Sequence, residues 1–260
     1  MAYDLRAIGV REGGVLLVHS SLRALGYVEG GPETVIQALL AALGPEGTLL
    51  MPALSYDHVT RRSPTFDVRH TPSNVGAIPE YFRLRLGTRR SVHPTHSVCA
   101  VGPQTAELLD DHLLDDTPCG PRSPFHKLRD VGGQLLMLGC GLYANTLMHA
   151  IEELVEPPYL YADPIAYRLI HADGRVTAKT YRPHSFRYFD QRYDRVAGVL
   201  DEPALHRGRV LAAEMYLIDV PALWEAVLAA LRRDPLYFVD AFSGRPSTNA
   251  ESAATAQPGS

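Results

Sequence analysis

Residues 13–44 read GGVLLVHSSLRALGYVEGGPETVIQALLAALG, and this stretch decides the fold class. A short apolar run after the two glycines predicts a buried strand over 15–18, and a glycine-containing polar loop follows it. Pro32 suits the first turn of a helix, and Gly44 suits the position just past its end. The stretch therefore predicts a strand, a loop and a helix in that order.

The same alternation of apolar runs and helical patterns continues along the chain. Further elements are expected as strands over 47–52 and 134–139 and as helices over 74–86, 103–113 and 220–232. Strands alternating with helices imply an α/β fold, a three-layer sandwich around a mixed, partly parallel sheet. Around Asp173-Gly174, apolar and polar residues alternate about a strong turn signal, which predicts an antiparallel hairpin extension in the C-terminal third.

Length and composition favour a single domain over residues 1–242. A chain of 260 residues with 46% hydrophobic side chains buries a sizeable core. The pattern changes character from about residue 157, so a C-terminal subdomain over 157–242 is the alternative. Residues 243–260 are poor in large apolar side chains, and we expect them to form a disordered tail.

Charge and cysteine content exclude several classes of protein. Lys and Arg number 25 against 29 Asp and Glu, so the chain lacks the basic excess of a nucleic-acid-binding protein. Three widely spaced cysteines do not form a disulfide framework, which favours a reducing cytoplasm. The sequence contains neither an export signal nor a run of about 18 apolar residues, so we expect no membrane association.

Residues 145–153 read NTLMHAIEE and are the first candidate for chemistry. Asn145 is a preferred helix-capping residue, and on the helix His149 can meet Glu152 or Glu153, because residues three and four apart share a face. Spacing leaves that choice open. A carboxylate at this distance orients an imidazole as a general base, although an ordinary polar helix surface fits the pattern too.

A second candidate is the loop over 18–31, where hydroxyl residues and glycines lie between the first strand and its helix. Backbone N–H groups exposed at such a place hold phosphate groups readily. The loop lacks the lysine of a P-loop and the spacing of the dinucleotide fingerprint. An ordinary strand-to-helix connection is therefore the alternative.

Metal donors occur at tight spacing in the segment with His93, His96 and Cys99. A structural zinc site usually needs four ligands, and no second pair of donors supplies the rest. We favour a tight turn shaped by Pro94 that leads into a strand, and we predict no metal site.

Acidic residues gather in two places that could attract a cationic ligand. Asp57 and Asp67 lie in the long irregular loop after the second strand, and such loops often carry function. The segment ELLDDHLLDD over 107–116 clusters five acids, which a solvated helix face explains better.

Six segments occur in an order that identifies a family. They are VHSSLRALGYVEGG, TLLMPALSYDH, TFDVRHTPSNVGAIPEYFR, RRSVHPTHSVCAVG, DDTPCGPRSPFHKLRDVGGQLLMLGCG and NTLMHAIEE. Together they resemble the aminoglycoside 3-N-acetyltransferase family over about residues 10–231. The resemblance implies a distinctive α/β fold, acetyl-CoA as cofactor, and acetyl transfer to a primary amine with both substrates bound at once.

The resemblance also implies roles for single residues. His149 matches the family's general base, Glu152 its acidic partner, and Thr146 a hydroxyl residue near the reacting centre. The positions implied to bind the cofactor are Ser20, Ser21, Leu22, Gly26, Val28, Gly30 and Ser123.

The acceptor site departs from the resistance enzymes. They commonly carry RSANPGAS-like sequence where this chain has RSVHPTHS, and LHYAE-like sequence where it has MHAIEE, so His93, His96 and Glu153 are expected to line a different pocket. A polycationic aminoglycoside needs carboxylates, for which we predict Asp57, Asp67, Glu80 and Glu153. Arginines over 61–90 either neutralise that pocket, face away, or meet the cofactor's phosphates.

These features predict a cytoplasmic, acetyl-CoA-dependent aminoglycoside 3-N-acetyltransferase, monomeric or homodimeric, acting on a small-molecule amine. One alternative is the same reaction on a different amine. Another is a metal-dependent hydrolase built on His93, His96, Cys99 and His149, and a third is a CoA-binding protein without activity.

Overall fold

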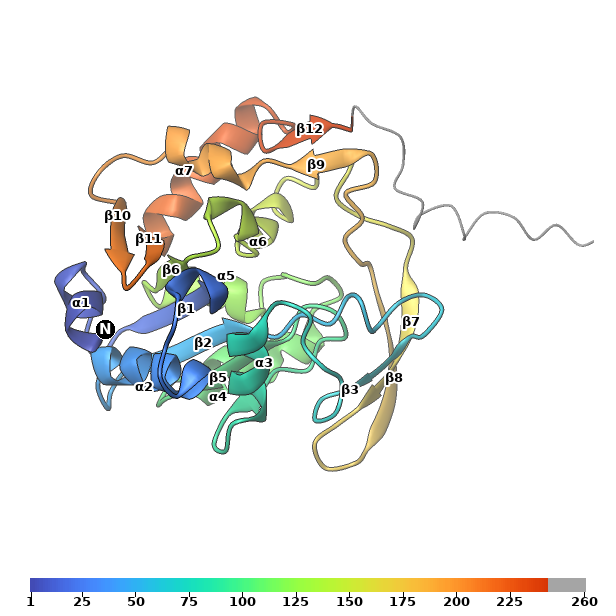
Figure 1. Ribbon diagram of the computed structural model, residues 1–260. Helices are drawn as coiled ribbons and strands as arrows, with labels where there is room; N and C mark the ends of the chain where they lie inside the picture. The colour runs from blue at the N-terminus through green and yellow to red at the C-terminus, as the bar shows by residue number, and fades with distance from the viewer. Residues whose placement is uncertain (243–260) are drawn as a thin grey trace, which may run out of the picture.

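Seven strands form one mixed sheet at the centre of the molecule, in the computed structural model that describes residues 1–242 (Figure 1). The strand order is β10-β11-β6-β1-β2-β5-β4. In chain order these strands are β1 (Val15–Ser20), β2 (Thr48–Pro52), β4 (Arg89–Arg90), β5 (Val98–Val101), β6 (Gln134–Leu138), β10 (Leu205–Val210) and β11 (Ala213–Asp219).

Strand β1 lies between two parallel neighbours. It pairs with β2 in the register Leu16 with Leu49, and with β6 in the register Leu17 with Leu135. All the outer pairings of this sheet are antiparallel. The prediction of a mixed, partly parallel sheet is confirmed.

Helices cover both faces of this sheet (Figure 1). One face carries α1 (Ala2–Ala7), α2 (Gly31–Leu43) and α3 (Ala77–Leu84), and the other carries α4 (Thr105–Leu109), α5 (Pro124–Asp130), α6 (Met148–Glu152) and α7 (Val220–Arg233). Successive side chains of a strand point to opposite faces, so Leu16 and Val18 pack with α2 while Val15 and Leu17 pack on the other side. The three-layer prediction is confirmed.

The predicted hairpin around Asp173-Gly174 is β7 (Ile165–Ile170) and β8 (Val176–Tyr181). It adds to β3 (Thr65–Asp67) and forms a separate three-stranded sheet on the side away from β10 and β11 (Figure 1). A further antiparallel pair, β9 (Phe189–Gln191) and β12 (Val239–Ala241), forms a two-stranded sheet of its own. The antiparallel pair β10 and β11 on the main sheet was not predicted.

Three helices are shorter than the sequence patterns predicted. The helix expected over 74–86 begins only at Ala77, because Gly76 has a φ of +118° and the backbone N–H of Asn74 donates to Leu54. The helix expected over 103–113 ends at Leu109 and continues as a 3-10 turn.

Helix α6 has only five residues, and Asn145 is not its N-cap. The N-cap is Leu147, while the side chain of Asn145 accepts a hydrogen bond from the Leu147 N–H and closes the turn before the helix. The helix ends early because Glu156 has a φ of +46° and two prolines follow it. A helix is present as predicted, but the prediction that Asn145 caps it was wrong.

None of the helices within residues 1–242 is both long and apolar enough to cross a membrane. The tail predicted over 243–260 lies outside the described residues.

Candidate active site

A cavity of about 560 Å³ opens at the carboxyl ends of the central strands. Ser20 ends β1, Pro52 ends β2 and Cys140 follows β6, and all three line the cavity. This edge of an α/β sheet is where ligands usually bind. Four histidines also line it, namely His19, His96, His149 and His184.

His149 lies on α6 and is held by a buried hydrogen-bond network. Its Nδ1 is 3.1 Å from Oε2 of Glu152 and 2.9 Å from the hydroxyl of Tyr193. Glu152 is fully buried, and it accepts further hydrogen bonds from the hydroxyls of Tyr193 at 2.7 Å and Tyr159 at 2.8 Å. The carboxylate is thus enclosed by three donors.

The network selects one tautomer of the His149 ring. The only hydroxyl hydrogen of Tyr193 is donated to Glu152, so Nδ1 of His149 must supply the hydrogen of its own contact with that carboxylate. In the neutral ring Nε2 then carries the lone pair. A nitrogen in this state on the cavity wall can accept a proton from a bound ligand.

Burial keeps the two phenols in their donating form. It raises the pKa of Tyr159 and of Tyr193 far above the ordinary value, and the neighbouring Glu152 raises the pKa of both further. Both hydroxyls therefore stay protonated across the neutral pH range, which keeps Glu152 supplied with hydrogen bonds.

The next residue, Glu153, serves a different histidine. Its Oε1 is 2.8 Å from Nε2 of His184 and accepts a bond from the backbone N–H of Cys119, while Oε2 accepts from the hydroxyl of Thr117. Burial raises the pKa of Glu153 to about 7, although these hydrogen bonds lower it. Consecutive glutamates thus support two histidines of one cavity.

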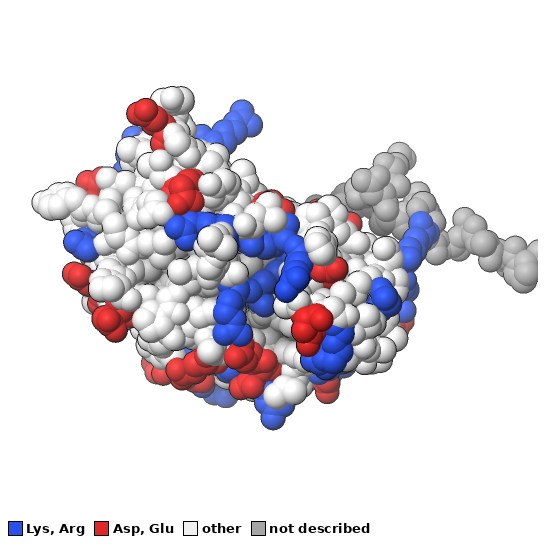
Figure 2. Space-filling view, turned by 90° about the horizontal axis from the view of Figure 1, so that it is seen from below, with Lys and Arg blue, Asp and Glu red and all other residues white. Residues whose placement is uncertain are grey.

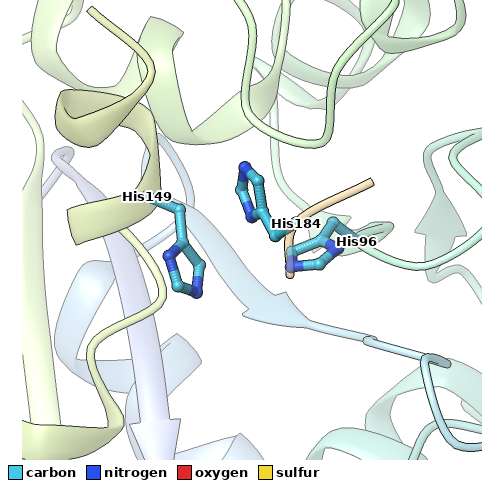
Figure 3. A group of neighbouring side chains, drawn as sticks. All are labelled: His96, His149 and His184. Carbon is cyan, nitrogen blue, oxygen red and sulfur yellow. The ribbon is translucent and has the colours of Figure 1, made fainter. Parts of the chain in front are cut away.

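The remaining histidines of the cavity are neutral at physiological pH. Burial lowers the pKa of His19 to about 3 and the pKa of His96 and His184 well below the usual value, and neighbouring histidines lower each further. Figure 3 shows His96, His149 and His184 facing one another from three separate segments. One ring nitrogen from each lies within 4.8 Å of the other two.

Besides His149, two of the residues that were predicted to act in catalysis or to bind the cofactor line the cavity. They are Thr146 and Ser20. The backbone N–H of Thr146 donates to Nε2 of His19 at 3.2 Å, which ties the end of β1 to the turn before α6. This bond is made by the backbone and does not involve the hydroxyl of Thr146.

The other predicted cofactor residues lie away from the cavity wall. Ser21, Leu22, Gly26, Val28 and Gly30 form the partly exposed loop between β1 and α2. Gly30 has a φ of +75°, a backbone conformation that favours glycine. A Cβ at this position would also collide with the side chain of Thr34.

Ser123 is fully buried, and its side chain accepts from the N–H of His126 as the N-cap of α5. That position has a structural task of its own.

The carboxylates predicted to bind the acceptor are not among the residues that line the cavity. Asp67 accepts from the backbone N–H groups of Arg69 and His70, and Glu80 forms an ion pair with Arg83 at 2.6 Å. Glu153 lies behind His184.

Asp57 is exposed and follows Tyr56, which does line the cavity. Of the four predicted carboxylates it is the one that is both exposed and next to the cavity wall in sequence.

Five arginines of the 61–90 region line a different part of the surface. A separate groove of about 950 Å³ contains Arg69, Arg83, Arg85, Arg89 and Arg90, and Figure 2 shows basic side chains along a hollow on this side of the molecule. Within the described chain, none of the residues lining the histidine cavity is an arginine or a lysine. These arginines therefore do not neutralise the cavity.

The metal donor set considered from the sequence is not assembled. The ring of His93 stacks on His112 at 4.9 Å, and Cys99 lies in the hydrophobic core on the α2 face of the sheet. The histidines that do gather with His96 are His149 and His184.

Sequence reasoning missed several residues of this site. His19 lies in the candidate loop over 18–31 but was not singled out, and in the structure it belongs to β1. His184 and Tyr159 come from irregular segments after α6, and Tyr193 begins a 3-10 helix. Those segments carry no periodic pattern, so only the three-dimensional structure places them beside His149.

Comparison with known proteins now identifies the family. The family model described as aminoglycoside 3-N-acetyltransferase matches residues 17–232. The chain belongs to the aminoglycoside 3-N-acetyltransferase family. It is 34% identical over 239 residues to aminoglycoside N(3)-acetyltransferase IV of a Salmonella species, a match that covers 91% of this chain and 87% of the relative.

A second relative is matched over a shorter stretch. Aminoglycoside N(3)-acetyltransferase VIII of Streptomyces fradiae is 38% identical over 172 residues. The chain spans 60% of the length of that relative, and the same share of this chain is covered.

Two solved structures share the fold across most of the chain. Aminoglycoside acetyltransferase AAC-IIIb, as a binary complex with CoASH, has 28% identity and a TM-score of 0.78 and covers 94% of this chain and 97% of its own. A mutant of aminoglycoside acetyltransferase AAC(3)-IVa in complex with apramycin has 33% identity and a TM-score of 0.74 and covers 89% and 90%. The resemblance inferred from the six sequence segments is confirmed. No comparison supports the hydrolase alternative.

Proposed function

We propose that this protein transfers the acetyl group of acetyl-CoA to a primary amine, the 3-amine of an aminoglycoside. The observation that carries the proposal is the His149–Glu152 pair on the cavity wall, with the lone pair of Nε2 left free for a substrate. The family membership and the complexes of its relatives with CoASH and apramycin support the identity of the two substrates.

The reaction follows from the state of His149. As the amine nitrogen attacks the thioester carbonyl carbon, Nε2 of His149 takes one proton from that nitrogen, and Glu152 stabilises the imidazolium that results. The carbon–sulfur bond then breaks, and the imidazolium returns the proton to the sulfur of CoA. Because both substrates are held together, the transfer needs no covalent acyl-enzyme.

The negative charge on the tetrahedral intermediate needs a donor where it develops. The backbone N–H of Ser21 is already engaged by the carbonyl of Leu138, and that of Thr146 by His19. We therefore assign this role to the hydroxyl of Thr146.

We place acetyl-CoA along the β1–α2 loop, with its thioester at Ser20 and its pantetheine and phosphates along Ser21, Leu22, Gly26, Val28 and Gly30. The partial exposure of this loop supports the assignment. Ser123 acts by capping α5 rather than by direct contact.

The acceptor enters from the side of His96 and Tyr56, and we propose Asp57 as the carboxylate that attracts it. Asp67 and Glu80 attract the cationic acceptor from a longer distance. Glu153 contributes indirectly, because it orients His184.

A different amine acceptor is the second candidate. It is favoured by the absence of Asp and Glu from the lining residues of the cavity, as far as residues 1–242 are concerned.

A thiol-release assay with acetyl-CoA separates these candidates. Purified protein is tested against apramycin, gentamicin, sisomicin, other aminoglycosides and simple primary amines, with each amine omitted in turn as the control. Release of CoA with an aminoglycoside, and an acetylated 3-amine in the product by NMR, supports the first proposal. Turnover of simple amines alone would replace it by the second, and no turnover with any amine would reject both.

The same proposal places the protein in the cytoplasm, where acetyl-CoA is made. Its three cysteines are all free thiols, as expected in a reducing compartment.

A further inference from the structure

Three histidines of the cavity come from distant parts of the sequence. His96 lies in the turn before β5, His149 lies on α6, and His184 follows β8 (Figure 3). Each offers one ring nitrogen, and these three nitrogens lie within 4.8 Å of one another. The proposed acetyl transfer uses only one of them.

The second nitrogen of each ring is engaged by a polar side chain. Nδ1 of His96 contacts the hydroxyl of Thr95 at 2.9 Å. His149 and His184 are each held by a buried glutamate, through Nδ1 and Nε2 respectively. The nitrogens not used in these contacts are Nε2 of His96, Nε2 of His149 and Nδ1 of His184.

Two further observations indicate that these nitrogens suit a ligand. Nδ1 of His184 is buried and has no hydrogen-bond partner within the described chain. A buried polar atom of this kind calls for an explanation such as a bound ion. In addition, a histidine that binds a metal almost always has its other nitrogen held by a carboxylate, a carbonyl or a water, as His149 and His184 have.

We propose that His96, His149 and His184 form a binding site for Zn²⁺, with the fourth position of the ion open to the cavity. Three imidazoles and one exchangeable position are a common ligand set for this ion. Zinc–nitrogen bonds of about 2.0–2.1 Å place the ligand nitrogens about 3.4 Å apart, so the three rings move closer together when the ion binds.

The site depends on His96, one of three histidines that face one another from separate segments (Figure 3). His184 supplies the third ligand from the irregular segment after β8.

Zinc binding has one consequence that rests on the proposed function. The ion occupies the lone pair of Nε2 of His149, which is the atom that accepts the proton of the amine. Bound Zn²⁺ therefore inhibits acetyl transfer, and it competes with the amine because both occupy the same end of the cavity.

Metal binding is tested directly on the full chain, without a polyhistidine tag and after removal of metal by a chelator. Co²⁺ is titrated as a spectroscopic substitute for Zn²⁺, and Zn²⁺ binding is measured by calorimetry. We expect one ion per chain, with the intense visible absorption of four-coordinate Co²⁺. His96→Ala and His184→Asn should each weaken binding about 100-fold or more.

The matched control is His206→Asn, which removes an exposed histidine of β10 and should bind Zn²⁺ as the unmodified protein does. Circular dichroism checks that each variant is folded. Absence of one-to-one binding, or equal binding by His96→Ala and the unmodified protein, would overturn the zinc site.

An activity measurement distinguishes the zinc site from the proposed acetyl transfer. Zn²⁺ should inhibit thiol release in competition with the amine, and the inhibition should be reversed by chelation and be about 100-fold weaker in His96→Ala. If Zn²⁺ binds but no amine is acetylated, the zinc site stands and the proposed function fails. If acetyl transfer proceeds and no Zn²⁺ binds, only the zinc site is rejected.

Discussion

Glu152 and Glu153 are neighbours on one short helix, yet they hold different histidines in different ways. Glu152 accepts hydrogen bonds from His149 and from the hydroxyls of Tyr159 and Tyr193. Glu153 is bound by a threonine hydroxyl, a backbone N–H and His184. Spacing in the sequence could not separate them, because both lie within reach of His149 on a helix.

The two carboxylates of this helix differ in protonation and therefore in their roles. The two phenols beside Glu152 cannot give up their protons at neutral pH, so that carboxylate is permanently surrounded by donors. Burial of Glu153 is only partly offset, and its pKa rises to about 7. We infer that Glu152 stabilises a cation on His149, whereas Glu153 orients His184.

The largest effect is expected from His149→Asn, which removes the proposed base and keeps a polar side chain. We expect kcat/KM for acetyl transfer to fall about 10³-fold, the usual range for loss of a general base. Binding of acetyl-CoA, measured by calorimetry, should change less than about twofold. His206→Asn is the matched control, and near-normal turnover by His149→Asn would remove the base from this residue.

Glu152→Gln tests the first half of the comparison. The amide keeps the shape but lacks the charge that stabilises the imidazolium, so we expect kcat to fall about 10²-fold with little change in the binding of acetyl-CoA. Glu153→Gln is the paired variant, and it should lower kcat less than about 10-fold. Equal effects of the two substitutions on kcat would contradict the division of tasks.

The pH dependence of stability tests the other side of the comparison, the raised pKa of Glu153. The pKa of Glu153 is raised from 4.5 to about 7, so the folded protein keeps a proton that the unfolded chain has already released over this range. The contribution of Glu153 to stability is therefore largest at low pH and is lost as the pH rises from about 4.5 through about 7.

The measurement is the melting temperature of the unmodified protein and of Glu153→Gln between pH 5 and pH 8. The variant should gain about 5 °C relative to the unmodified protein as the pH rises. A constant difference would show that the pKa of Glu153 is not raised.

The smallest effects are expected at the two phenols. Tyr193→Phe removes a hydroxyl that contacts both His149 and Glu152, and we expect about a 10-fold loss of kcat. Tyr159→Phe removes a contact to Glu152 alone and should cost about threefold. Steady-state kinetics of both variants would contradict this order if Tyr159→Phe proved the more damaging.

Much of the fold could be predicted from the sequence, because the central strands and α2 and α7 have clear apolar patterns and end signals. The position of helix α6 was predicted correctly, but its predicted start was too early, because Asn145 stabilises the turn before the helix and does not cap the helix itself. The strands β10 and β11 were missed: β10 is a mostly exposed edge strand without a clear apolar alternation, and the alternation in β11 breaks down over its last residues.

Only part of the candidate site could be predicted from the sequence. His149 and Glu152 follow from the helix spacing and the family resemblance, whereas His184 and Tyr193 reach the cavity from segments 35 and 44 residues after His149. No local pattern connects such positions. For Ser123 the family resemblance implies a cofactor position, and the structure adds a role that the resemblance did not predict, because the buried side chain caps α5.

The role of His149 as the base depends on the tautomer of its ring, which ¹⁵N NMR of protein with labelled histidine measures directly. The His149 signals are assigned by their loss in His149→Asn. We expect a protonated Nδ1 and an unprotonated Nε2 in the neutral ring. A neutral ring with its hydrogen on Nε2 would contradict it, because no lone pair would then face the cavity.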